Sequence, residues 1–69
     1  MDIAILVGRN VRALRRDAGM TQEELGFQAG FERSYISDLE RGTRNPTIRA
    51  LEKLASALGV PAKRLLEDV

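Results

Sequence analysis

The spacing of two glycines and an isoleucine in residues 22–41 (QEELGFQAGFERSYISDLER) constrains the fold of this chain more than any other feature. Gly26 is small at a position where two helices would have to touch. Gly30 can adopt a positive φ, which a sharp turn requires and which a residue with a Cβ resists. Ile36 then returns an apolar side chain to the interface between the helices. The spacing predicts two short helices that are joined by a tight glycine turn.

Apolar residues at helical spacing predict another helix before this pair. It covers about residues 2–18, and Val7, Val11, Leu14 and Ala18 form its apolar stripe. Gly8 weakens such a helix by about 1 kcal/mol relative to alanine. This cost allows residues 1–6 to pack as a separate turn or arm.

Capping residues mark where the other helices begin. Thr21 followed by Glu24 is a capping box, which predicts a helix that runs to about Ala29. The next helix is expected to begin near residue 32 or 33 and to end at residue 42. Thr47 is a good N-cap for a fourth helix. The inner face of that helix is expected to carry Ile48, Leu51, Leu54, Ala55 and Leu58.

A last short helix is expected after Pro61, with Leu65 and Leu66 on it, because proline is tolerated in a first helical turn. No segment has the alternating pattern of a strand. The prediction is an all-α fold of five short helices. The length of 69 residues predicts one domain, residues 1–69.

The composition narrows the function classes. The chain has no cysteine and no histidine, so it lacks thiolate chemistry, the commonest general base and the commonest metal ligand. We therefore expect no catalytic residues, no metal and no cofactor. No apolar run approaches the roughly 20 residues that a membrane span needs. A cytoplasmic protein without membrane contact is expected.

Arginines dominate the basic residues, although the formal net charge is only +1. Arginine is the cation better suited to phosphate and guanine. One group of arginines lies within residues 9–16, and a second, within residues 41–49, follows the second helix of the glycine-turn pair. Two helices of this kind form a helix-turn-helix, which places its second helix in the major groove of DNA. The polar residues on the outer positions of that helix are Glu32, Arg33, Ser34, Tyr35, Ser37 and Asp38.

Five segments in order (MTQEEL, the AG turn, SYISDLERG, RNPTI and LEKLASALGV) resemble the lambda-repressor-like, Xre/Cro/C1-type helix-turn-helix family over about residues 8–66. The segment RSYISDLERGTRNP resembles the small controller proteins of restriction-modification systems. The resemblance implies a compact five-helix DNA-binding domain with the helix-turn-helix in its second and third helices. It also implies a homodimer that regulates transcription, as a repressor or an activator.

The resemblance also implies roles for particular residues. Gln22 would contact phosphate, and Arg33 and Ser34 would read bases. Tyr35 and Ser37 would touch sugar-phosphate or a thymine methyl group. The loop residues that would grip the backbone are Arg41, Arg44 and Asn45, and an Arg15–Glu40 pair would tie the first helix to the third.

Several of these residues have simpler interpretations. Ser34 could cap its helix, and Tyr35 could pack flat on the surface. Asp38 would be repelled by phosphate, so it either accepts a hydrogen bond from cytosine or pairs with an arginine. The C-terminal apolar residues Val60, Leu65, Leu66 and Val69 are interpreted as a dimer interface. Alternatively, the two leucines close the core over Leu58.

The sequence thus predicts a double-stranded DNA-binding regulator. It would act as a homodimer on a palindromic operator and read the major groove with the third helix. Activation would need contact with RNA polymerase, for which Glu23 and Glu24 are candidates. The alternative is a protein-interaction or antitoxin-like module that keeps the fold, and the net charge of +1 is its best support. An enzyme is the least favoured class.

Overall fold

The computed structural model describes residues 2–68, which form four α-helices and a final 3-10 helix, without any strand. The helices are α1 (Ile3–Asp17), α2 (Gln22–Ala29), α3 (Arg33–Glu40), α4 (Ile48–Leu58) and η1 (Ala62–Leu66). The all-α prediction is confirmed. The fifth element is a 3-10 helix rather than an α-helix, because its five residues close only tight turns such as Arg64 N–H to the Pro61 carbonyl, 3.0 Å.

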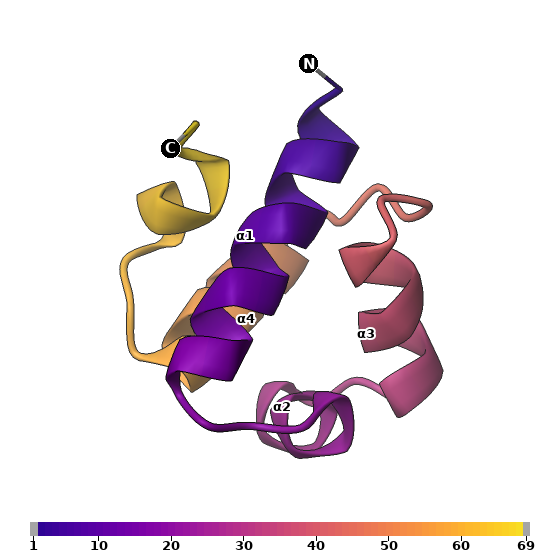
Figure 1. The fold of residues 1–69 in the computed structure, drawn as a ribbon, viewed down its shortest axis with the longest axis vertical. Coiled ribbons are helices and arrows are strands. Elements are labelled where there is room, and N and C mark those ends of the chain that lie inside the picture. The colour runs from indigo at the N-terminus through magenta and orange to yellow at the C-terminus, as the bar shows by residue number, and fades with distance from the viewer. Residues whose placement is uncertain (1, 69) are drawn as a thin grey trace.

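Helix α1 runs through the centre of the molecule, with α4 behind it (Figure 1). Helix α3 lies on one side of α1 and η1 on the other, while α2 crosses near the C-terminal end of α1 (Figure 1). The consecutive helices α2 and α3 therefore form the helix-turn-helix on one flank of the central helix. No helix within residues 2–68 combines the length and the apolar character needed to cross a membrane.

Side-chain caps fix where the helices begin. The Thr21 hydroxyl accepts a hydrogen bond from the Glu24 amide (3.0 Å), and the Glu24 carboxylate accepts one from the Thr21 amide (2.8 Å). Thr47 caps α4 by accepting from the Ala50 amide at 3.0 Å. The predicted capping box and the Thr47 N-cap are confirmed. Asp2 caps α1 in the same way, through the Ala4 amide at 2.7 Å.

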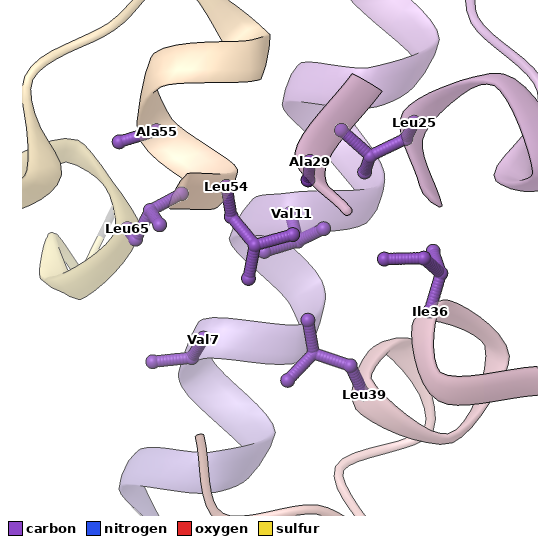
Figure 2. Packing of buried hydrophobic residues seen from close by; sticks show 9 residues of the cluster. All are labelled: Val7, Val11, Leu25, Ala29, Ile36, Leu39, Leu54, Ala55 and Leu65. Atoms are coloured by element: carbon purple, nitrogen blue, oxygen red, sulfur yellow. The ribbon is translucent and has the colours of Figure 1, made fainter. Parts of the chain in front are cut away.

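All five elements contribute to one apolar core. Figure 2 shows α1 side chains meeting side chains of α3 and α4 near the middle of the molecule. Burial of each large aliphatic side chain stabilises the fold by about 1.5–3 kcal/mol. The core residues are Val7, Val11, Leu25, Ala29, Ile36, Leu39, Leu54, Ala55 and Leu65.

Three expectations about packing are wrong. Residues 3–6 are a continuous part of α1 rather than a separate arm, because Asp2 caps the helix and Ala4 is buried; Met1 lies outside the described residues. Ala18 is exposed because α1 ends at Asp17 and Ala18 only caps it. Ile48 is 86% exposed because it is the first residue of α4, before that helix reaches the core.

Candidate nucleic-acid interface

The turn between α2 and α3 requires glycine at two positions. Gly30 has a φ of 84°, in the left-handed region that favours glycine. The amides of Gly30 and Phe31 both donate to the Gly26 carbonyl, at 2.9 and 2.7 Å. A Cβ at Gly26 would lie 2.5 Å from the Phe31 carbonyl oxygen and 3.4 Å from Cγ1 of Ile36. These close contacts fix α3 against α2.

The outer face of α3 is polar and accessible. Ile36 and Leu39 turn into the core, which leaves the first-turn side chains of Arg33 and Ser34 exposed and Ser37 half-buried. Ser34 does not cap α3, because Glu32 occupies the N-cap position and no side chain caps that end. Arg33 and Ser34 are therefore free to contact a ligand in front of α3.

A buried ion pair joins α1 to α3 beside this surface. The Glu40 carboxylate accepts from Nε of Arg15 at 2.6 Å and from Nη2 at 3.0 Å. Arg15, only 9% exposed, also donates to the Met20 carbonyl at 2.8 Å. The hydrogen bond from Arg15 to Glu40 raises the pKa of Arg15 above its ordinary value, so the guanidinium remains charged.

Gln22 at the start of α2 belongs to the same network. Its side-chain amide donates to the Glu40 carboxylate at 3.1 Å. Glu40 therefore receives hydrogen bonds from α1 and α2 while it closes the last turn of α3. This network sets the position of the α2 N-terminus relative to α3.

Tyr35 packs on the protein surface. Its ring stacks on Phe31 with centroids 4.4 Å apart and an interplanar angle of 16°. The Arg44 guanidinium lies 4.8 Å from the Tyr35 ring centroid, within the range of a cation–π interaction. Tyr35 thus supports the loop that follows α3, in agreement with the packing interpretation.

Asp38 is paired with the arginines of that loop. Its carboxylate forms an ion pair with Arg41 and lies 3.9 Å from Nε of Arg44. The backbone carbonyl of Asp38 accepts from the Thr43 hydroxyl at 3.0 Å. Arg44 and Asn45 are exposed in the loop between α3 and α4. Asp38 therefore holds Arg41 and Arg44 beside the outer face of α3.

A hollow of about 360 Å³ opens where α1, α2 and α3 meet. It gathers Gln22, Ser37 and Arg41, which the sequence predicted as DNA contacts, together with Arg12 and Arg16, which had no predicted role. The sequence does contain a signal for a role of these two residues in binding, because both belong to the arginine group in residues 9–16. The paired side chains of Arg15 and Glu40 form the rest of the lining.

The C-terminal residues predicted for the dimer interface differ in accessibility. Leu65 is fully buried and lies in the core, so its assignment to the interface is wrong. The Asn10 side chain holds η1 against α1 by donating to the carbonyls of Leu65 (2.9 Å) and Glu67 (2.8 Å). Leu66 is 45% exposed and Val60 is half-buried, while Val69 lies outside the described residues.

Comparison with known proteins assigns the chain to a family. The Helix-turn-helix family (HTH_3) matches residues 11–65. The chain is 55% identical over 60 residues to the uncharacterized HTH-type transcriptional regulator y4dJ of Sinorhizobium fredii, a match that covers 87% of this chain and 78% of that protein. It is 46% identical over 67 residues to the control protein C.BamHI of Bacillus amyloliquefaciens, covering 96% and 83% of the two chains.

A solved structure agrees with this assignment. The restriction-modification controller protein C.AhdI from Aeromonas hydrophila superposes with a TM-score of 0.87 at 39% identity, over 90% of this chain and 94% of that one. These relatives are regulators and control proteins, which confirms the expectation of a regulator rather than an enzyme. The close homologues of the chain include restriction-modification controller proteins. The chain belongs to the Xre-type helix-turn-helix family of DNA-binding transcriptional regulators.

Proposed function

We propose that the chain is a sequence-specific controller-type regulator that binds double-stranded DNA as a homodimer at a palindromic operator. The observation that carries this proposal is the exposed first turn of α3, held rigidly by the glycine turn and by the buried Arg15–Glu40 pair. An α-helix fits the major groove, where base edges differ in their donors and acceptors. The first turn of α3 would enter that groove.

Arg33 and Ser34 would read bases in this arrangement. Arginine can make a bidentate contact to O6 and N7 of guanine, which discriminates against other bases by about 1–3 kcal/mol. Arg33 is exposed and forms no ion pair within residues 2–68, so binding to DNA would not first have to break one. Ser37 and Tyr35 would touch the adjoining sugar-phosphate.

The residues around α3 would position the protein on the backbone. Gln22 would contact phosphate at one side of α3, and the loop residues Arg41, Arg44 and Asn45 would contact it at the other. Phosphate contacts fix register and orientation without reading sequence. Arg41 and Arg44 would exchange the Asp38 carboxylate for phosphate when the complex forms.

A second copy would complete the operator-binding unit. Val60 and Leu66 remain accessible on the side of η1 and, with Val69, are the proposed dimer interface, whereas Leu65 is excluded by its burial. Two reading helices about 34–36 Å apart would address half-sites one turn of DNA apart. Selection of bound sequences from random duplexes would return a two-fold symmetric site. A single half-site, or no enrichment at all, would contradict the homodimeric operator.

Binding is expected to weaken steeply with salt. Each neutralised phosphate contributes about 0.9 to the slope of log affinity against log salt. In a homodimer, Arg41 and Arg44 of each protomer would together neutralise four phosphates and contribute about −3.6 to the slope, and any further phosphate contact would add to it. Fluorescence anisotropy with a labelled duplex over a series of salt concentrations measures this slope. A protein-interaction or antitoxin-like module would instead bind a protein with little salt dependence and leave the duplex unbound.

Arg33→Ala and Arg44→Ala are expected to weaken binding in different ways. Arg33→Ala should flatten the preference for the operator over sequences altered at one base pair, because it removes a base contact. Arg44→Ala should weaken binding to all sequences by a similar factor and reduce the salt slope. Competition binding with the operator and its single-base variants measures both effects. Uniform weakening in both variants would remove Arg33 from the reading role.

A further inference from the structure

We propose that Arg12 and Arg16 of α1 form an additional DNA-phosphate site at the hollow between α1, α2 and α3. The inference rests on the proposed DNA-binding function and extends the backbone contacts from the helix-turn-helix to the central helix. The ligand is a phosphodiester group of a strand that also passes Gln22 and Arg41. Free inorganic phosphate shares this chemistry and is distinguished by the experiment.

The first observation is the distribution of ion pairs. Within residues 2–68, five arginines have a carboxylate within 4.0 Å, namely Arg15, Arg41, Arg44, Arg49 and Arg64. The arginines that have no such partner in this part of the chain are Arg9, Arg12, Arg16 and Arg33. Three of these four lie on α1. The arginines without an ion pair in the described residues therefore gather on the central helix and on the first turn of the reading helix, whereas the two lysines lie on α4 and η1.

The second observation is the hollow itself. Arg12 and Arg16 are one helical turn apart and line the same hollow of about 360 Å³. Like charges four residues apart destabilise a helix, so this pair has no favourable role within the isolated α1. The only acid in the lining is Glu40, whose carboxylate already accepts from Arg15 and Gln22. Of the four arginines in the lining, Arg15 is paired with Glu40 and Arg41 with Asp38, so Arg12 and Arg16 carry the local excess of positive charge.

The third observation is the continuity of the hollow with the proposed DNA surface. Its remaining lining residues are Gln22, Ser37 and Arg41, all of which we assign to backbone or groove contacts. A strand held by Gln22 and Arg41 would therefore run past the exposed side chains of Arg12 and Arg16. Guanidinium groups bind phosphate oxygens with two parallel hydrogen bonds, and a phosphodiester would supply the anion that the protein itself does not. DNA backbone is favoured over a free anion because the same hollow borders the outer face of α3.

The test compares two double variants with the same change in charge. Arg12→Gln/Arg16→Gln removes the proposed contacts, and Lys53→Gln/Lys63→Gln removes two exposed positive charges outside the hollow. We expect the first variant to lower the salt slope of duplex binding by about 0.9 for each phosphate that is no longer neutralised. The ratio of affinities for operator and unrelated duplex should stay unchanged, because phosphate contacts carry no sequence information. The lysine variant should change the slope by less than half as much.

Further measurements make the outcomes decisive. Arg12→Lys/Arg16→Lys keeps the charge and should retain the wild-type slope, and circular dichroism melts check that every variant folds. A slope for Arg12→Gln/Arg16→Gln that equals that of the wild type or of the lysine variant would overturn the inference and leave the proposed function intact. Titration with inorganic phosphate that binds the wild type, together with an unchanged duplex slope, would reassign the hollow to a free anion and also overturn it. A wild type that binds no duplex would overturn the proposed function first.

Discussion

Gly8→Ala is expected to lower the free energy of unfolding by about 3 kcal/mol or more, at the upper end of the usual cost of overpacking. Natural domains have about 0.05–0.15 kcal/mol of stability per residue, so the free energy of unfolding of a chain of 69 residues is small. Helix propensity alone predicts the opposite sign, because alanine in a helix interior is favoured over glycine by about 1 kcal/mol. The sign of the change therefore separates the two effects.

The expected destabilisation comes from the crossing of α1 and α3. A Cβ on Gly8 would overlap the Leu39 carbonyl oxygen and lie 3.0 Å from that of Glu40. Both neighbours are backbone atoms, so no side-chain rotation can relieve the overlap. The two helices would have to separate, and this movement would also pull Glu40 away from Arg15. The close approach of α1 to α3 thus supports the stability of the core and the position of the reading helix together.

Urea unfolding followed by circular dichroism measures the effect. Ala13→Gly, at an exposed position of the same helix, is the matched control and should cost only the propensity difference of about 1 kcal/mol. A Gly8→Ala variant that is more stable than the wild type would show that the helices do not approach this closely.

Local signals explain why so much of the fold could be predicted. The capping box at Thr21 and Glu24 and the cap at Thr47 act through hydrogen bonds that span three residues, so their meaning is contained in a short segment. The glycine turn at Gly30 is equally local. The starts of α2 and α4 were predicted correctly for this reason.

The errors arose where distant segments decide the packing. Leu65 was interpreted as an interface residue, but Asn10 fixes η1 against α1 through contacts 55 and 57 positions away in sequence. Gly8 was interpreted as a weak point of its helix, whereas the backbone of α3 requires it there. Ile48 fits the apolar stripe of α4, yet the stripe extends one turn beyond the core.

The candidate site depends on both kinds of information. The family resemblance implied the pairing of Arg15 with Glu40, and the exposure of Arg33 follows from the inward turn of Ile36 and Leu39. The hollow that contains Arg12 and Arg16 could not be predicted, because its lining comes from three helices. The sequence of one segment does not show which way its arginine side chains point relative to the neighbouring helices.

Glu40→Ala is expected to be the most damaging change at the site, lowering the free energy of unfolding by about 3–5 kcal/mol. Removing one partner of a buried ion pair leaves the other charge uncompensated. The side chains of Arg15 and Glu40 are only 10% and 5% exposed, so the Arg15 guanidinium has little contact with solvent to compensate for the missing carboxylate. The Gln22 amide would also be left without its partner. Thermal and urea unfolding of the variant measure the destabilisation.

The double variant Arg15→Met/Glu40→Leu separates the energetic role of the pair from its positioning role. Replacing a buried ion pair with apolar residues of similar volume is often neutral or stabilising, so the double variant should recover most of the stability that Glu40→Ala removes. The double variant cannot restore the hydrogen bond from Gln22 to Glu40. The Gln22 side chain would then approach the DNA backbone without a fixed orientation. We therefore expect a folded protein with weaker operator binding. If the double variant is as unstable as Glu40→Ala, the destabilisation comes from losing the hydrogen bonds of the pair rather than from an unpaired charge. If it binds the operator as tightly as the wild type, the pair does not position Gln22 for binding.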